Sequence, residues 1–146
     1  MLKQLRLGLL ALMTLGAVLP VVAQVRHVTT VNPNSKRSYM EVYEFDYVDI
    51  QPQFPGGECA LINFINKTRV YPYHAYKNRI QGRVLCSFIV GTDGRVSEAR
   101  VIRSAGDETL DREALRVIGK MPKWSVGKVD DRAVPVRVVL PINFRL

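Results

Sequence analysis

Few side chains in this sequence could perform catalysis or bind a metal, and their spacing gives them no common site. The two histidines, His27 and His74, do not have the spacing of paired metal ligands on a helix. Cys59 and His74 could act as nucleophile and base, but no third residue is placed to orient the histidine. We therefore interpret His74 as a solvent-facing imidazole, and the sequence predicts neither a metal site nor an enzyme.

Acidic and glycine-rich segments also have structural explanations. Four acidic residues lie where a helix is predicted to begin: Asp107, Glu108, Asp111 and Glu113. Negative charge stabilises that end of the helix dipole, so these residues do not indicate a catalytic pair. Gly56-Gly57 and Gly91-Thr92-Asp93-Gly94 lack the spacing of a P-loop or a dinucleotide-binding loop. They indicate turns, and no cofactor is expected.

The chain is basic, with 21 Lys and Arg residues against 13 Asp and Glu residues and a net charge of +8. The basic residues are scattered and form no stripe with interleaved aromatic residues, so nucleic acid is not an expected partner. In an exported protein, anionic lipid, cell-wall polymer or an acidic receptor segment would be attracted by this charge.

The N-terminus has the pattern of a targeting segment. Lys3 and Arg6 are positively charged, and an apolar run from Leu7 to Val22 follows them. Ala23 then supplies a small residue before Gln24. This pattern predicts a cleaved signal peptide over residues 1–23 and an exported, periplasmic protein. The alternative is an inner-membrane anchor, because the run is close to the lower limit of about 17 residues that span a bilayer.

Two cysteines, Cys59 and Cys86, form an even pair, and an oxidising compartment would permit a disulfide between them. Cys86 alternates with Val84, Phe88 and Val90 in an apolar strand, where a cysteine usually acts as a small buried hydrophobic residue. We therefore expect Cys86 to be buried and unbridged.

Hydrophobic periodicity predicts two helices and three strands in the C-terminal two-thirds of the chain. They are a helix at 58–66, strands at 82–90 and 95–103 joined by a turn, a helix at 107–121 and a long strand at 134–146. A β-bulge is expected near Ser97 or Glu98, because Val96 is out of phase with the apolar residues that follow. The expected domain covers residues 48–146, after a flexible leader at 24–47; a weak extended pattern runs from Tyr39 to Ile50.

This order of elements predicts an α+β fold with a three-stranded antiparallel sheet. The second helix crosses from the second strand to the last, so the first strand lies between them and the sheet order is 2-1-3. Both helices are expected to pack on one face, because three strands alone cannot shelter their apolar side. The last strand is then at an open edge.

The prolines of that last strand suggest which side is open. Pro135 and Pro141 have odd numbers and lack a backbone donor, so the backbone groups of the odd positions are expected to point toward the open edge, away from the central strand. The odd positions that keep their donors are Arg137, Val139, Asn143 and Arg145. A partner segment could add there as another strand, and Arg137 and Arg145 are placed to attract an acidic segment.

A series of short motifs resembles the TonB C-terminal domain in order and spacing. They are Gln53-Phe54-Pro55-Gly56-Gly57, Tyr71-Pro72 with Ala75, Gln81-Gly82-Arg83-Val84, Asp93-Gly94-Arg95-Val96, Ala114, Met121-Pro122-Lys123-Trp124 and Leu140-Pro141-Ile142-Asn143-Phe144. The combination of Phe-Pro-Gly-Gly and Met-Pro-x-Trp is similar to the Bacteroidetes branch of that family. The resemblance covers about residues 48–146, and the ordered series is specific although each motif alone is weak.

The resemblance implies a non-enzymatic binding module of energy-coupled transport. Domains of this family bind the TonB box of outer-membrane receptors as a strand beside their last strand, and they act with the ExbB and ExbD partners when they are anchored. By position, the family's Tyr-Pro segment near that contact corresponds to Tyr71, Pro72, His74 and Arg79. A homodimer is a further possibility.

Two features differ from a full energy transducer of this family. The N-terminal apolar run lacks the histidine of the standard anchor, and the chain has no long spacer rich in Pro and Lys. Fully extended, the segment from Gln24 to Ile50 reaches about 90 Å at most. The alternative function is therefore a stand-alone envelope adaptor or structural protein that binds cell-wall or other envelope proteins.

Overall fold

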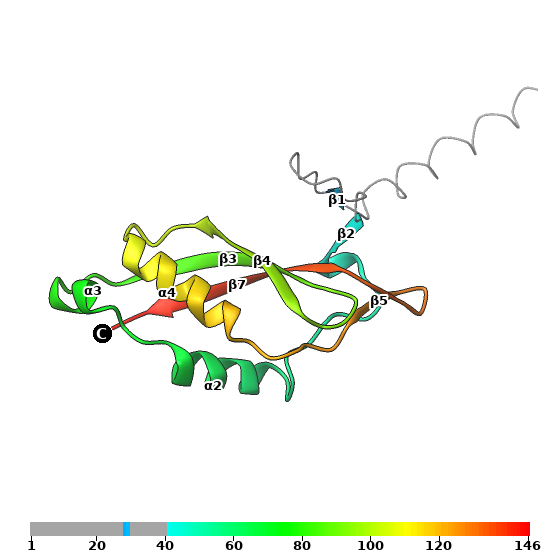
Figure 1. Cartoon of the computed structure of the whole chain (residues 1–146), viewed down its shortest axis with the longest axis horizontal. Coiled ribbons are helices and arrows are strands. Elements are labelled where there is room, and N and C mark those ends of the chain that lie inside the picture. The colour runs from blue at the N-terminus through cyan, green and yellow to red at the C-terminus, as the bar shows by residue number, and fades with distance from the viewer. Residues whose placement is uncertain (1–27, 30–40) are drawn as a thin grey trace, which may run out of the picture.

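The computed structural model describes residues 28–29 and 41–146 (Figure 1). The predicted signal peptide or anchor at 1–23 lies outside these residues, as does the leader up to residue 40 apart from β1 (Val28–Thr29). Within the described part, no helix has the length and apolar character needed to cross a membrane.

The predicted helices and the predicted hairpin form within two residues of their expected ends. The remaining elements, in chain order, are β2 (Glu41–Glu44), the 3-10 helix η2 (Phe45–Tyr47), α2 (Glu58–Thr68), α3 (Tyr73–Lys77), β3 (Gly82–Val90), β4 (Val96–Arg103), α4 (Glu108–Gly119), β5 (Gly127–Val129), β6 (Arg132–Val134) and β7 (Val136–Phe144). The short elements α3, β5 and β6 were not predicted. The last strand is shorter than predicted, because Val134 belongs to β6 and Pro135 separates β6 from β7.

Three antiparallel strands in the order β4-β3-β7 form the centre of the main sheet, which confirms the predicted α+β class and the 2-1-3 order. β3 and β7 pair along their whole length, from Gly82 opposite Phe144 to Val90 opposite Val136. The sheet is larger than predicted, because β2 joins it parallel to β7 and β1 then pairs with β2.

β2 therefore lies within the segment that the sequence assigned to the flexible leader. The weak extended pattern between Tyr39 and Ile50 corresponds in part to β2. This segment continues onto the β5–β6 hairpin, because the amide of Ile50 donates to the Lys128 carbonyl at 3.1 Å and Lys128 donates back at 2.9 Å.

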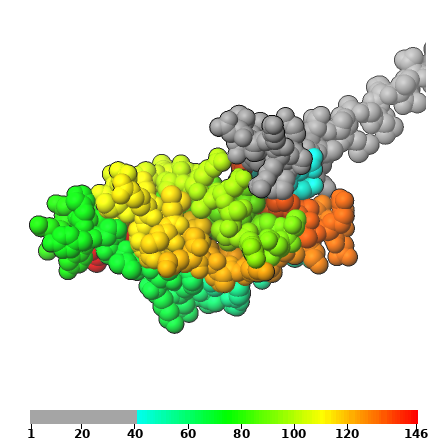
Figure 2. All heavy atoms as spheres, in the orientation of Figure 1, coloured from blue at the N-terminus to red at the C-terminus, as the bar shows by residue number. Residues whose placement is uncertain are grey.

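The hydrophobic core lies between one face of the sheet and the helices. In Figure 1, α4 crosses in front of β3 and α2 runs along the side of β7. The core side chains come from both layers: Val84, Cys86, Phe88 and Val90 of β3, Val138, Ile142 and Phe144 of β7, Leu110, Ala114, Val117 and Ile118 of α4, and Ile65 of α2. The space-filling view shows the same side of the molecule with α3 at one end and the β5–β6 hairpin at the other (Figure 2).

Three of the sequence motifs meet at Trp124. Its ring packs edge-on against Phe54 and Phe88, with centroids 5.8 and 5.4 Å apart. Its amide donates to the carbonyl of Gly94 at 2.8 Å. Gly94 has a φ of 83°, and a Cβ at this position would lie 2.2 Å from the Trp124 carbonyl oxygen. Only glycine fits this close approach, which explains why glycine stands at position 94 of the turn.

The expected β-bulge is present in β4, where Glu98 has a φ of 51° and the register with β3 shifts between Ser87 and Ile89. Cys86 is fully buried and free, as predicted, and Cys59 is free and exposed. Burial, and then the nearby charge of Asp111, raises the pKa of the Cys86 thiol to about 11.

Candidate partner-binding edge

The side chains of β7 alternate between the core and the outside. Val136, Val138, Ile142 and Phe144 are buried, as expected for the even positions. At the odd positions, Val139 is 48% exposed, which makes it the most exposed aliphatic residue of the strand. The alternation confirms which residues of β7 face away from the helices.

The first part of the β7 edge is occupied by the chain itself, which corrects the expectation of a fully open edge. The Tyr43 amide of β2 donates to the Pro135 carbonyl at 2.9 Å, and Glu44 stands opposite Arg137 in the parallel register. Nη1 of Arg137 lies 3.5 Å from Oε1 of Glu44. Arg137 is therefore not a free cation, and Pro135 and Arg137 are covered by β2.

The last part of the edge is also engaged. Arg69, at the end of α2, donates from Nη1 to the Asn143 carbonyl, and its guanidinium lies 5.7 Å from the centre of the Phe144 ring. The backbone carbonyl of Asn143 is therefore not free, contrary to expectation. In sequence Arg69 is distant from β7, so the strand pattern gave no signal for this contact.

What remains without a strand partner is a short stretch, residues 139–143, which we call the free edge; within it, the Asn143 carbonyl accepts from Arg69. No described strand pairs with β7 on this side beyond Arg137. Because Pro135 directs its carbonyl toward β2, alternate residues further along β7 direct their backbone groups to the same side. Val139 then presents a donor and an acceptor, whereas Pro141 presents only an acceptor.

A groove of about 360 Å³ lies between α2 and the free edge. One wall comes from α2 and the other from the end of β7 and the residues after it. The lining residues are Ile62, Ile65, Asn66, Arg69, Pro141, Asn143 and Arg145. Ile65 and Asn66 follow Ile62 by three and four positions, so these residues share one side of α2.

The second group of predicted residues lies around α3, at the end of the sheet. Tyr71 contacts β7, because its ring packs edge-on against Phe144 at 5.8 Å while its hydroxyl donates to the Ile80 carbonyl at 2.5 Å. Pro72 is the residue before α3. His74 is 63% exposed, and its Nδ1 lies 3.7 Å from Oδ2 of Asp107 at the start of α4.

Arg79 follows α3 in an exposed turn with a φ of 55°. The structure thus brings Tyr71 into contact with β7, whereas His74 is directed to α4. In the described residues, no hydrogen bond or ion pair connects Arg79 with the other predicted site residues.

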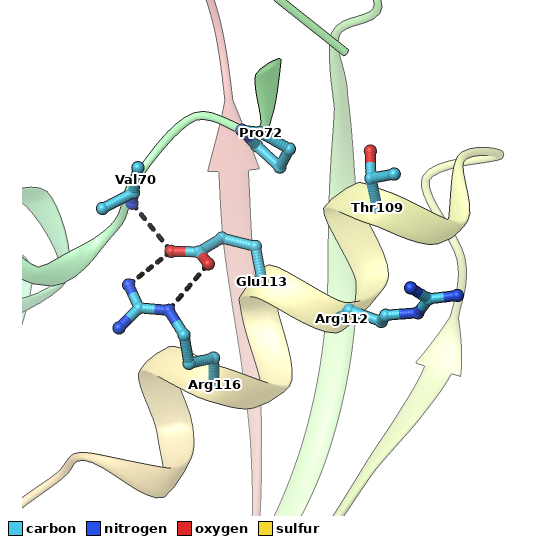
Figure 3. A pocket seen from close by; sticks show the side chains of 6 residues that line it. All are labelled: Val70, Pro72, Thr109, Arg112, Glu113 and Arg116. Carbon is cyan, nitrogen blue, oxygen red and sulfur yellow. Dashed lines mark hydrogen bonds and ion pairs between the residues drawn. The ribbon is translucent and has the colours of Figure 1, made fainter. Parts of the chain in front are cut away.

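A second hollow lies between α4 and the segment that follows α2, and Figure 3 shows its lining residues. At its centre the Glu113 carboxylate accepts hydrogen bonds from the Val70 amide at 2.7 Å and from Arg116 at 2.6 and 2.8 Å. Burial would raise the pKa of Glu113, but the hydrogen bonds from Arg116 and Val70 outweigh it and lower the pKa. The Glu113 carboxylate is therefore fully engaged. It connects α4 to the segment after α2 and is not free to bind a ligand.

The comparisons with known proteins identify the family of this chain. Residues 67–146 match the family described as Gram-negative bacterial TonB protein C-terminal. Protein TonB of Haemophilus influenzae is 48% identical over 59 residues, which cover 40% of this chain and 22% of that protein. Protein TonB of Pasteurella multocida is 34% identical over 93 residues, or 60% of this chain and 33% of that protein.

The NMR solution structure of a Helicobacter pylori TonB C-terminal domain has a TM-score of 0.48 and 28% identity over 59% of this chain and 77% of that chain. This chain spans 22% and 33% of the length of the two curated relatives, so the likeness is to one part of those proteins. The family match covers more than half of this chain, from residue 67 to its last residue. The chain therefore belongs to the family of Gram-negative bacterial TonB protein C-terminal domains.

Proposed function

We propose that this chain is a periplasmic binding module that engages TonB-dependent outer-membrane receptors by strand addition and so supports energy-coupled transport across the outer membrane. Membership of the TonB C-terminal family supports the class of partner. The basic charge of the chain supports attraction of an acidic segment. Association with ExbB and ExbD belongs to the proposal only if residues 1–23 are retained as an anchor.

The single observation that carries this proposal is the free edge of β7. An edge strand with unpaired backbone groups is a template for another strand. Here the unpaired stretch is bounded by β2 on one side and by Arg69 on the other. A receptor segment would therefore pair with Val139, in a register limited by the missing donor of Pro141.

The same proposal gives the α3 end a supporting role. Tyr71 packs against Phe144, the last residue of β7, and so holds the end of the strand in place. Pro72, His74 and Arg79 are proposed to contact a receptor beyond the added strand, because they lie in or next to α3, which follows Tyr71.

The test compares two substitutions at one position. Val139→Pro removes the donor of the free edge, whereas Val139→Ala removes most of the exposed side chain but keeps the donor. Purified variants are used to recover partners from the detergent-solubilised envelope of the source bacterium, and recovered outer-membrane receptors are quantified. We expect Val139→Pro to recover about tenfold less receptor, because the loss of one backbone hydrogen bond and the steric effect of the proline ring both weaken binding. Val139→Ala should recover nearly as much as the unmodified chain.

Stability must be measured in parallel, because a misfolded variant would also lose its partner. Both variants should unfold within about 1 kcal/mol of each other in urea, since Val139 is half exposed. Unchanged receptor recovery by a folded Val139→Pro variant would show that the partner docks elsewhere. Recovery of cell-wall or other envelope proteins in place of receptors would favour the adaptor alternative.

A further inference from the structure

We propose that the groove between α2 and β7 recognises a carboxylate side chain on the added strand, held by Arg69 and Arg145. This inference rests on the proposed strand addition and specifies the chemistry of the partner: an extended segment with an acidic residue that reaches the end of β7. The groove thereby selects among the segments that could pair with the free edge.

The charges in the groove support an anionic occupant. Its lining contains two arginines and no acidic residue. Among the described residues, neither Arg69 nor Arg145 forms an ion pair, whereas Arg112, Arg116 and Arg137 each have a carboxylate partner. The Arg69 guanidinium lies over the Phe144 ring and donates to one backbone carbonyl, that of Asn143. Both guanidinium groups could therefore form stronger, charge-assisted hydrogen bonds with a carboxylate.

The chain itself shows how a strand on this edge presents a carboxylate. β2 lies beside the start of β7 and places Glu44 next to Arg137, with 3.5 Å between the charged atoms. Arg145 has the same odd parity as Arg137 and follows the other end of β7. A second strand beside the free edge would bring its own side chains to Arg145 in the way that β2 brings Glu44 to Arg137.

The other walls of the groove favour a peptide over a small anion. Ile62, which is 50% exposed, gives the α2 wall an apolar surface, on which the methylene groups of a glutamate could pack. The backbone groups of Val139 lie further along the same edge and suit the main chain of an extended segment. An isolated anion would leave both features unused.

The probes are synthetic peptides of alternating valine and threonine in which one glutamate is moved through successive positions. A matched set carries glutamine in place of glutamate, so the two sets differ only in charge. Affinity is measured by isothermal titration at low salt with the full chain. The best glutamate peptide should bind about tenfold more tightly than its glutamine counterpart, which corresponds to a hydrogen bond with a charged group.

Three variants identify the residues responsible. Arg145→Gln should reduce the glutamate preference to less than about threefold and leave the affinity for the glutamine peptide unchanged. Arg69→Lys keeps the positive charge but loses the planar fork of the guanidinium, so it should retain only part of the preference. Arg100→Gln is the matched control, because Arg100 is exposed on β4 at the opposite side of the sheet; it should retain the full preference.

The outcomes separate this inference from the proposed function. If both peptide sets bind equally and Val139→Pro weakens both, strand addition stands and the groove proposal is overturned. If Arg100→Gln lowers the preference as much as Arg145→Gln, the effect is one of overall charge, and the groove proposal is again overturned. Absence of binding by every peptide would overturn the groove proposal, while the recovery of receptors by the Val139 variants tests the proposed function separately.

Discussion

Glu113 links two segments that are far apart in the sequence, and its pH dependence can be tested. Hydrogen bonds from Arg116 and Val70 outweigh burial and hold the pKa of Glu113 below its ordinary 4.5. A carboxylate whose pKa is lowered by folding stabilises the native state above its unfolded pKa, and this contribution is lost as the pH falls through the folded pKa. We expect Glu113→Gln to lower the free energy of unfolding at pH 7 by about 1–3 kcal/mol.

Urea unfolding at a series of pH values measures this effect. The difference between the unmodified chain and Glu113→Gln should shrink once the pH falls below 4.5, the ordinary pKa of the group. Glu108→Gln is the control, since Glu108 forms an exposed ion pair with Arg112 on the same helix and should contribute about 0.5 kcal/mol or less. A difference that does not change with pH would show that Glu113 acts through its shape rather than its charge.

A second prediction at the scale of one residue concerns the reactivity of the Cys86 thiol. Because burial raises the pKa of its thiol to about 11, Cys86 should remain protonated and unreactive in the native protein at pH 7. Thiol titration should detect only the exposed Cys59 before unfolding and both cysteines after it. Cys86→Ser should lower the free energy of unfolding by about 1–3 kcal/mol, since the hydroxyl would be buried among apolar residues. Cys59→Ser should have little effect, and unfolded, non-reduced protein without a free thiol would contradict the prediction.

At the scale of the elements, the contact between the β3–β4 turn and the segment after α4 depends on Gly94. A Cβ there would meet the backbone of Trp124, which cannot move without disturbing its aromatic contacts. Gly106 has a similar φ of 91°, but a Cβ would meet nothing within 4 Å. Both alanine variants incur about 1 kcal/mol of left-handed backbone strain, and Gly94→Ala should lose about 1–3 kcal/mol more because of the clash. Thermal and urea unfolding would measure the difference, and equal losses would disprove the steric explanation.

The sequence predicted the long elements because each of them buries a complete face. The apolar spacing of α4 and the alternation in β3 and β7 are sufficient to define a helix and two strands. In contrast, β2, α3, β5 and β6 have three to five residues each, too few for a periodic pattern to be distinguished clearly.

The candidate site was predictable only in part, for a related reason. Alternation along β7 shows which side chains face outward, and Val139 is found exposed as expected. The pairing of β2 with Arg137 and the contact of Arg69 with Asn143 join residues 93 and 74 positions apart, so no local pattern could predict them. The one available signal was the spacing of Ile62, Asn66 and Arg69, which places them on one side of α2.

At the scale of the whole molecule, the two sides of the sheet are protected from pairing with another strand in different ways. β4 forms one edge, and its pairing with β3 is interrupted by two shifts of register. Its sequence also alternates charges, with Glu98, Arg100 and Arg103 all exposed. Bulges and charges of this kind discourage pairing with another strand. On the other side, only residues 139–143 of β7 have no strand partner among the described residues.

The short length of this unpaired stretch has a consequence for solubility. A long bare edge would let identical chains polymerise edge to edge, but a few residues between two obstacles give such a contact too little area to persist. Tyr43→Pro should remove the donor that ties β2 to Pro135, while Tyr43→Ala removes the same ring and keeps the donor. Light scattering over a concentration series should show earlier aggregation for Tyr43→Pro, and identical curves would refute this role. The strand that narrows the binding edge would thereby also raise the concentration at which the purified protein begins to aggregate.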